Sequence, residues 1–353
     1  MAHSEGAAGS AEPVAMGRAR ITDVAARAGV SIKTVSRVMN DERGVRPETR
    51  ERVLDAVREL RFVPNTMARS LKTGGAEAIG LLIDAFSDPF FSEFASVIDE
   101  LALEHELMVL VASTSFDAER ENDQLMRLAG NQLRGLIIAP VAVDAEQLRA
   151  LRHRFPIVCA DRAREGVDSV VIDDFGSACA ATAQLIAHGH TRIGFVGRED
   201  RYPTNTARLR GFHSAMSDAG LAVDDTLIVR HGRDRASMAA LTAELLTRQD
   251  APTAVLCGTV RASIATIDAI RTTGAATPAL ISFGDFELAD AVQPAITCID
   301  QDPRAIATAA FERLRELIAQ PDLPPARIVV PTSTIRRGSG ELAPSTTRIG
   351  VPT

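Results

Sequence analysis

The stretch that decides the fold of the N-terminal region is "ITDVAARAGVSIKTVSRVMN", residues 21–40. Thr22 is a good N-cap, and the Asp23 that follows suits the positive end of a helix dipole, so we expect a helix to begin here. Val24 and Ala28 then fall on one face of that helix. The stretch therefore opens with a short helix that has one apolar side.

A turn separates this helix from a second one. Gly29 ends the first helix, because the turn needs a residue without a side-chain conflict, and Ser31 caps the second. The apolar face of the second helix is expected at Val35, Val38 and Met39. After a loop Pro47 can start a third helix. Its core-facing stripe is expected at Val53, Leu54, Val57 and Leu60. Two helices joined by "AGVS" predict a helix-turn-helix.

The second helix exposes the side chains that do not pack. They are Ile32, Lys33, Thr34, Ser36 and Arg37. In helix-turn-helix motifs the start of the second helix meets base edges, while hydroxyls and amides meet phosphates. The same spacing also fits a three-helix bundle with a solvated basic face, so at this point both interpretations stay open.

Charge is distributed unevenly along the 353 residues, which carry a formal net charge of −7. From Arg18 to Lys72 there are 13 Lys/Arg against 7 Asp/Glu. Two acidic residues precede this window, so residues 73–353 carry a net charge of −11. A basic module on an acidic body indicates a polyanionic partner for the module alone.

Length and composition limit the class of protein. A chain of this length is expected to form roughly two or three domains, and the 46% hydrophobic content can supply a sizeable core. No run approaches the roughly 20 apolar residues of a membrane span, and the N-terminus lacks a signal-peptide core. We therefore expect a cytoplasmic protein with no membrane partner.

The N-terminal segments together show a family resemblance. "ITDVAARAGVSIKTVSRVMN" and "VRPETRERVLDAVRELRFVPNTMARSLKTG" resemble the DNA-binding domain of LacI/GalR-family transcriptional regulators, without a gap from Ile21 to about Gly74. The shared elements are the AGVS turn, the TVSRV segment, the TRERV helix and the PN..A..L hinge. The body resembles the family too, so the resemblance covers about 330 residues.

The resemblance implies roles for individual residues at DNA. Ile32 and Lys33 match two variable positions that contact bases, and Arg37 matches a position that usually reaches a base edge. Ile32 can offer only apolar contact, for example to a thymine methyl, and Lys33 lacks the planar fork of arginine. The full implied set is Thr22, Ser31, Ile32, Lys33, Thr34, Ser36, Arg37, Asn40, Asn65, Ala68, Leu71 and Lys72.

The hinge from Pro64 to Leu71 is the second implied DNA contact. Asn65 can cap a short helix, which is expected to be unstable alone because helix nucleation is costly. In the family the hinge leucines of two subunits wedge into the minor groove. Leu71 holds the matching position, and Ala68 allows close approach. A flexible linker in the free protein and a folded hinge helix on DNA describe two ligation states.

From residue 76 onward short apolar runs alternate with stretches of helical period. Runs such as "AIGLLID", "RGLIIAP" and "AVLCGT" are apolar on both faces, which predicts buried, mostly parallel strands. Ten such runs suit two similar lobes better than one sheet. Expected intervening helices include 92–104, 176–188, 206–219, 261–273 and 304–318. Polar residues follow several strands, and strand ends line the ligand crevice of open parallel sheets. These residues are Asp84, Asp161, Asp173 and Asp285.

The fold class predicted is an N-terminal all-α helix-turn-helix domain with a hinge helix, followed by an α/β two-lobed effector domain. From the resemblance, this effector domain follows the periplasmic-binding-protein fold and the chain crosses between its lobes three times. The expected segments are a disordered tail at 1–19, the helix-turn-helix domain at 20–63, hinge and linker at 64–75, the effector and dimerisation domain at 76–345, and a tail at 346–353. Lobe one is expected at 76–174 and 303–331, and lobe two at 175–301 and 332–345.

The sequence gives no sign of a catalytic or metal site. It lacks GxSxG, Walker-type, HExxH and strand-following GxGxxG motifs. "HGH" at 188–190 has metal-ligand residues but stands where a helix C-cap is expected, and Asp161-Arg162 suits a binding or ion-pair role better than catalysis. The four cysteines form no CxxC, and those at 159, 257 and 298 are expected to be buried free thiols. We expect no enzyme activity and no cofactor.

The resemblance also implies an effector site between the lobes. The matching positions are Phe90, Phe91, Asp161, Arg208, Thr259 and Asp285. Arg208, in "ARLRGF", matches an arginine that binds sugar hydroxyls or a carboxylate. The family's frequent "GFDD" is Ser282-Phe283-Gly284-Asp285 here, and its frequent Asn is Thr259, so two polar contacts to a sugar are lost.

Together these observations predict a homodimeric repressor that binds double-stranded operator DNA and is controlled by a small-molecule effector, a sugar or a related metabolite. The alternatives are a binding protein of the same fold without a DNA role, an α/β enzyme, and a regulator whose partner is another protein. The basic module argues against the first. No long heptad tail follows residue 345, so a coiled-coil tetramer is not expected.

Overall fold

The computed structural model describes residues 19–39, 42–62, 78–115, 117–198, 201–230 and 234–344. The chain divides into two compact units between Gly75 and Ala76, and each is described by itself. Residues 1–18, the expected hinge at 64–75 and the expected tail at 346–353 lie outside the described residues. None of the described helices is long and apolar enough to span a membrane.

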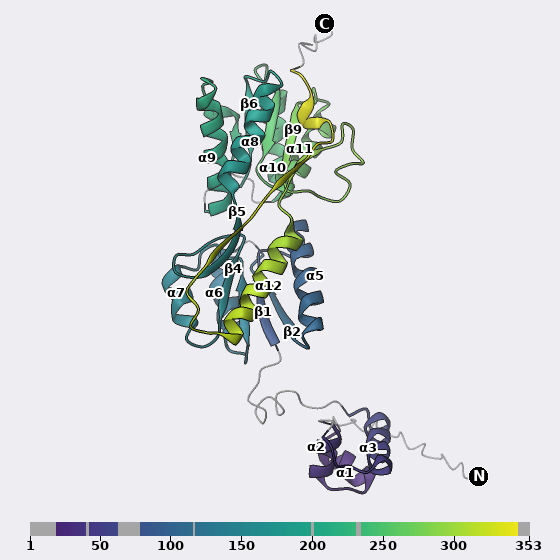
Figure 1. Cartoon of the computed structure of the whole chain (residues 1–353). Coiled ribbons are helices and arrows are strands. Elements are labelled where there is room, and N and C mark those ends of the chain that lie inside the picture. Colours follow the sequence, from purple (N-terminus) through teal and green to yellow (C-terminus); the bar gives the residue numbers. More distant parts are fainter. Residues whose placement is uncertain are drawn as a thin grey trace, which may run out of the picture. The chain divides into compact units, whose positions relative to one another are not determined.

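The first unit contains three short helices around a small core (Figure 1). They are α1 (Ile21–Ala28), α2 (Ile32–Met39) and α3 (Pro47–Glu59). Val24, Val35 and Val53 are fully buried between them, one from each helix. Because each helix is too short to be stable alone, this shared apolar contact is what holds the module together.

The turn between α1 and α2 forms as the sequence predicts. Gly29 takes a left-handed backbone with φ of 65°, and its N–H bonds the carbonyl oxygens of the last turn of α1. Ser31 then caps α2, because its Oγ accepts a hydrogen bond from the backbone N–H of Thr34 at 3.1 Å. Pro47 occupies the first turn of α3.

Two sequence predictions in this module are wrong. The N-cap of α1 is Arg20 and not Thr22, since the carboxylate of Asp23 accepts the Arg20 N–H at 2.7 Å and the helix begins two residues earlier. Leu54 is 39% exposed, and the core position is taken by Ala56. Ala56 is three residues after Val53, on the same helix face, whereas Leu54 is turned about 100° away.

The second unit has two six-stranded sheets, one in each lobe. The sheet of lobe one contains β1 (Ala78–Ile83), β2 (Met108–Ser113), β3 (Gly135–Ile138), β4 (Ile157–Ala160), β5 (Asp168–Ile172) and β11 (Arg327–Val330), in the order β11-β5-β4-β3-β1-β2. The sheet of lobe two contains β6 (Ile193–Val196), β7 (Ile228–Val229), β8 (Ala254–Cys257), β9 (Ala279–Phe283), β10 (Thr297–Asp300) and β12 (Ser333–Ile335), in the order β12-β10-β9-β8-β6-β7.

All ten apolar runs form strands, and two short strands were not foreseen. β7 has only two residues, and β12 carries serine and threonine instead of an apolar run. The pairs in both sheets are parallel except β10 with β12. The chain crosses between the lobes three times, after β5, after β10 and after β11 (Figure 1).

Helices cover both faces of each sheet, as parallel strands require. In lobe one they are α5 (Pro89–Glu104), α6 (Ala118–Ala129), α7 (Ala145–Leu151) and α12 (Pro303–Ala319). In lobe two they are α8 (Asp174–Ala187), α9 (Pro203–Asp218), α10 (Arg235–Thr247) and α11 (Val260–Thr273), with short 3-10 turns η1 (Asp225–Leu227) and η2 (Ser339–Glu341). The strands alternate between the two layers: Leu81 packs in the cluster that contains α5 and α12, and Leu82 in the cluster that contains α6 and α7.

Candidate functional site

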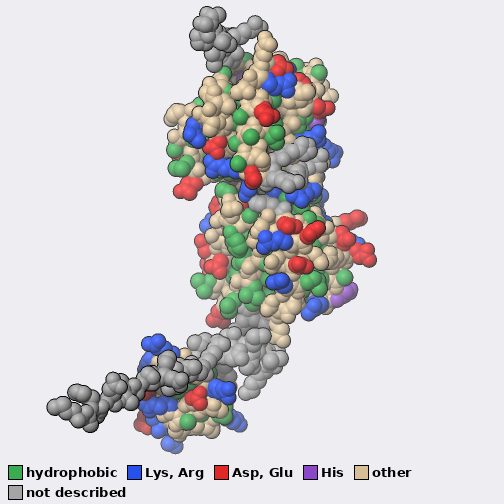
Figure 2. Space-filling model, turned by 180° about the vertical axis from the view of Figure 1, so that it is seen from behind, with side chains coloured by type: hydrophobic (Ala, Val, Ile, Leu, Met, Phe, Trp, Pro, Cys, Tyr) green, Lys and Arg blue, Asp and Glu red, His purple; other side chains and the backbone are tan. Residues whose placement is uncertain are grey.

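The outward face of α2 carries the side chains expected at DNA. Ile32 is 49% exposed and Lys33 is exposed, while Thr34, Ser36 and Arg37 are half-buried. Figure 2 shows Lys and Arg side chains over the visible face of this module. The helix therefore presents an apolar group and a cation at its N-terminal turn, where base-reading residues of a helix-turn-helix stand.

Arg37 is held by the loop that follows α2. Its Nε lies 3.3 Å from Glu42 Oε2, and its Nη2 donates to the carbonyl oxygen of Arg43 at 2.9 Å. This loop contact could not be read from the sequence, and it fixes the guanidinium before any partner binds. Asn40, Asn65, Ala68, Leu71 and Lys72 lie outside the described residues, so their roles stay predictions.

The ends of the parallel strands meet in a narrow cleft between the lobes. We call this space the inner cleft. Its volume is about 40 Å³, which is close to the volume that one molecule occupies in liquid water. Its lining residues are Asp84, Asp88, Phe90, Phe91, Asp161, Arg162, Arg198, Tyr202, Thr204, Asn205, Arg208, Thr259, Val260, Phe283 and Gln301.

Arg162 is the most strongly paired cation of the inner cleft. Its guanidinium donates to both carboxylate oxygens of Asp84, at 3.0 and 2.8 Å, and lies 3.0 Å from Asp161. From lobe two, the guanidinium of Arg198 lies 3.6 Å from the same Asp84 and 3.5 Å from the centre of the Tyr202 ring. Asp84 is thus a carboxylate of lobe one that attracts cations from both lobes.

Arg208 is fixed in the same way within lobe two. Its Nε donates to Asp174 Oδ1 at 2.7 Å, its Nη1 donates to the carbonyl oxygen of Gly258 at 2.7 Å, and it stacks over Phe283. Asp174 is buried, and burial raises its pKa to about 6 although the ion pair with Arg208 opposes the rise. Neither of these two hydrogen bonds uses Arg208 Nη2.

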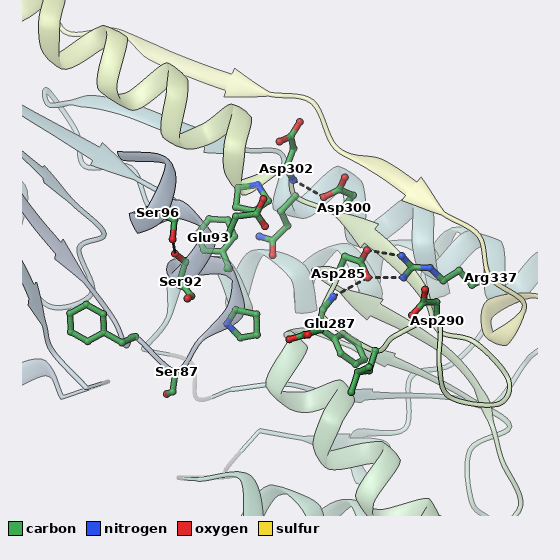
Figure 3. A pocket seen from close by; sticks show the side chains of 18 residues that line it. Ser87, Ser92, Glu93, Ser96, Asp285, Glu287, Asp290, Asp300, Asp302 and Arg337 are labelled. Atoms are coloured by element: carbon green, nitrogen blue, oxygen red, sulfur yellow. Dashed lines mark hydrogen bonds and ion pairs between the residues drawn. The ribbon is translucent and has the colours of Figure 1, made fainter. Parts of the chain in front are cut away.

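A larger cavity opens beside the inner cleft, and we call it the outer pocket. Its volume is about 950 Å³, and residues of both lobes surround it (Figure 3). Its lining residues are Phe86, Ser87, Pro89, Phe90, Ser92, Glu93, Ser96, Gly284, Asp285, Phe286, Glu287, Leu288, Asp290, Asp300, Gln301, Asp302, Pro303 and Arg337. Phe90 and Gln301 line both spaces, so the two are continuous parts of one interlobe region.

Comparison with known proteins assigns both parts of the chain. Residues 20–65 match the family of bacterial regulatory proteins called the lacI family, and residues 182–340 match the periplasmic binding protein-like domain. The HTH-type transcriptional repressor PurR of Photobacterium profundum is 30% identical over 307 residues, covering 85% of this chain and 92% of that protein. The chain belongs to the lacI family.

Other relatives agree with this assignment. The HTH-type transcriptional regulator DegA of Bacillus subtilis is 31% identical over 290 residues, covering 80% of this chain and 86% of that protein. The transcriptional regulator CelR in a cellobiose complex superposes with a TM-score of 0.65 at 26% identity, over 91% of this chain and all of that one. The lac repressor dimer bound to operator and an anti-inducer shares the fold, with a TM-score of 0.78 at 24% identity, over 93% of this chain and all of that one. The lacI-family chain is thus a regulatory protein and not an enzyme.

The structure brings together most residues that the sequence proposed for the effector. Phe90, Phe91, Asp161, Arg208 and Thr259 all line the inner cleft. Phe91 is 3% exposed and belongs largely to the core, and Thr259 also caps α11 by accepting the Ala262 N–H at 3.1 Å. These two side chains therefore have structural roles in addition to any contact with a ligand.

Two of the strand-end carboxylates expected at the crevice, those of Asp285 and Asp173, do not line the inner cleft. Asp285 lines the outer pocket, where Arg337 donates to both of its carboxylate oxygens at 2.6 and 2.7 Å. Asp173 lines neither space. It is exposed and caps α8, because its Oδ1 accepts the Gly176 N–H at 2.9 Å. The expectation that Asp173 lines the crevice is wrong, since the helix that follows β5 begins at once and uses this carboxylate.

Gly284 explains one departure of this lacI-family chain from the common "GFDD". Its φ is +95°, a conformation that side chains rarely adopt, and a Cβ there would stand 2.7 Å from Val260 Cγ2 and 3.0 Å from Gln301 Oε1. An aspartate would therefore be strained at this position. The neighbouring Gln301 amide takes part of the space that such a side chain would fill.

Several residues of the cleft were missed by the sequence. Arg198 and Tyr202 come from the segment between β6 and α9, Asn205 lies in the first turn of α9, and Gln301 follows β10 directly. The rule that strand ends line the crevice could have found Arg198 and Gln301, since each follows an apolar strand by one or two residues. Asp174 also follows its strand, β5, by two residues, but only the fold brings it to Arg208.

"HGH" and the cysteines are structural. His190 is buried, with Nδ1 2.8 Å from Thr253 Oγ1 and Nε2 2.8 Å from the carbonyl oxygen of Leu342. Gly189 takes the positive φ of a helix end, as predicted. Cys159, Cys257 and Cys298 are buried free thiols, and burial raises their pKa values to about 12, 11 and 12.

Proposed function

We propose that this chain is a transcriptional repressor that binds a near-palindromic operator as a homodimer and responds to a small-molecule effector between its lobes. The observation that carries the proposal is the outward face of α2, with exposed Ile32 and Lys33 and an anchored Arg37 in a module of the lacI family. Lys33 and Arg37 offer the N–H donors that suit guanine edges.

The dimer is supported by an apolar surface on lobe one. β2 is the last strand of its sheet, and it exposes Met108 by 61% and Val111 by 38%. Leu103, on the neighbouring α5, is 76% exposed. Figure 2 shows hydrophobic side chains gathered on one side of lobe one. An exposed apolar strand edge is a liability that a second copy would cover, and two copies around a two-fold axis require matching half-sites.

A sugar or a related metabolite is the effector class that the relatives support. One relative is named a ribose operon repressor, and CelR was solved in a cellobiose complex. In this chain, Phe90, Arg208 and Asp161 offer the apolar face and fixed polar groups that a sugar ring needs. Small-molecule sites usually have about 300–1,000 Å³, so the inner cleft must widen before it accepts such a ligand.

Widening of the inner cleft is the physical route by which the effector changes DNA binding. The contacts of Arg198 with Asp84 and of Arg162 with the Tyr202 ring join the lobes in this form. A ligand that enters must replace these contacts and so changes the angle between the lobes. Because the modules of two copies share one operator, a change in lobe angle alters the spacing of the recognition helices.

The operator is tested by selecting binding sites from random DNA with the full-length chain. We expect an enriched motif with inverted symmetry. Arg37→Ala should weaken binding to it by about 1–3 kcal/mol and relax specificity at one base pair. Arg58→Ala, on α3 and 73% exposed, is a control that removes the same charge from another helix. A motif without inverted symmetry would contradict the dimer, and equal loss on random DNA would reduce Arg37 to a phosphate contact.

The cleft is tested with a charge-balanced pair of changes. Arg208→Gln combined with Asp174→Asn removes the ion pair without leaving either charge buried alone. We expect this variant to bind the operator normally and to lose its response to the effector found by a thermal-shift screen of sugars and nucleosides. An unchanged response would show that the signal does not enter through Arg208.

A further inference from the structure

The outer pocket carries an excess of negative charge. Six of its lining residues are acidic, and one is basic. The acidic ones are Glu93, Asp285, Glu287, Asp290, Asp300 and Asp302. Arg337, the single basic residue of the lining, donates two hydrogen bonds to Asp285. Its charge therefore does not balance the other carboxylates.

The five remaining carboxylates form no ion pair within the part of the chain that the structure describes. Asp300 accepts the backbone N–H of Asp302, and Asp302 accepts that of Ala305, both at 2.8 Å. Uncompensated charges around a concave surface focus the potential and raise the local concentration of cations. The electrostatics of this pocket therefore favour a positively charged ligand.

Gln301 independently indicates a ligand at the same place. It is only 6% exposed, and it lines both the inner cleft and the outer pocket. Its side-chain amide forms no hydrogen bond with any other residue that the structure describes, and neither amide atom is among the buried atoms left without a partner, so the amide is open to solvent in the interlobe space. An amide on an almost fully buried side chain that is open to solvent at a pocket wall keeps its donor and acceptor for a ligand.

The walls between the carboxylates are apolar. Phe86 is 58% exposed and Leu288 is 65% exposed, and Phe286 lies beside them in the lining. Among the described residues no three acidic, histidine or cysteine side chains come together closely enough to hold a metal ion. The carboxylates are thus spaced around the pocket with apolar surface between them, an arrangement that fits cationic groups separated by methylene chains.

We propose that the outer pocket binds an aliphatic polyamine, a chain with two or more ammonium groups. Its volume of about 950 Å³ is ample for such a molecule. Glu93 belongs to lobe one, and Glu287 and Asp290 belong to lobe two, on opposite sides of the opening (Figure 3). A polyamine between these carboxylates holds the two lobes together and acts as a second, cationic effector. This inference therefore rests on the proposed function.

The test is titration calorimetry of the full-length chain with spermidine, without DNA and at constant ionic strength. We expect saturable binding that Glu287→Gln with Asp290→Asn weakens at least tenfold. Asp225→Asn with Glu244→Gln is the matched control, because it removes the same charge from exposed positions of lobe two outside the pocket. This control should change the affinity less than twofold, and Gln301→Met should weaken binding severalfold.

Three results would overturn the proposal: no saturable binding of spermidine, equal loss in the pocket and control variants, or equal competition by Mg²⁺ at the same ionic strength. Operator binding by the same preparations separates the two ideas. If the chain selects a palindromic operator and releases it with a sugar but ignores spermidine, the polyamine site fails and the repressor stands. Spermidine binding with the expected variant pattern supports the site even if no operator is found.

Discussion

The inner cleft and the outer pocket are neighbouring parts of one interlobe region, yet they handle charge in opposite ways. In the inner cleft Arg162 and Arg208 are each held by a buried carboxylate, and the space is almost filled. In the outer pocket five carboxylates form no ion pair with any residue that the structure describes, and the space is wide. The inner charges therefore fix the geometry of the cleft, whereas the outer charges remain available to attract a ligand.

The largest change in the free energy of unfolding is expected from Asp84→Asn, which neutralises one of the inner charges. Asp84 is fully buried and holds the guanidinium of Arg162 through two hydrogen bonds. Its neutralisation leaves a buried cation with Asp161 alone, and losing one partner of a buried pair costs about 3–5 kcal/mol. Urea unfolding of the wild type and the variant measures the loss. A change below about 1 kcal/mol would show that the inner charges are as loosely engaged as the outer ones.

A smaller effect, dependent on pH, is expected from Asp174. Burial raises its pKa to about 6, so the folded state binds a proton more tightly than the unfolded state does. The stability of the chain should therefore fall as pH rises from about 4 to 6, by up to about 3 kcal/mol, and this contribution should stay constant above pH 6.

The measurement is the free energy of unfolding of the wild type and of Asp174→Asn at several pH values. Other groups titrate in both proteins, so the difference between the two isolates Asp174. The wild type should lose stability relative to the variant across this window. Parallel curves would mean that the ion pair with Arg208 overcomes the effect of burial.

The smallest effect is expected in the outer pocket. Asp290 and Glu287 are exposed and have no ion-pair partner among the described residues. Replacing them by Asn and Gln should change the free energy of unfolding by no more than about 0.5 kcal/mol, with a slight gain if repulsion between the carboxylates is relieved. The same urea experiment checks this. A large loss would show that these carboxylates stabilise the fold, and would remove the contrast with Asp84.

The sequence predicted strands and strand ends well, because a buried parallel strand needs an unbroken apolar run. The predicted strand ends alone therefore placed Asp84 and Asp161 at the crevice. The sequence could not pair Arg162 with Asp84, which is 78 positions away, or Arg208 with Asp174, because only the packed sheets bring them together. The helical period alone also placed Leu54 in the core, which is wrong, because an apolar stripe on a helix can lie to either side of its most buried residue.

The second crossing between the lobes has a consequence for the synthesis of the chain. The sheet of lobe one is completed by β11, and its helix layer by α12, which places Phe311 and Leu314 in the core. Both elements follow all of lobe two except β12 and η2. A ribosome therefore has to release almost the entire polypeptide before lobe one can close, so a nascent chain halted near residue 300 would leave lobe one unfinished while lobe two is already largely built.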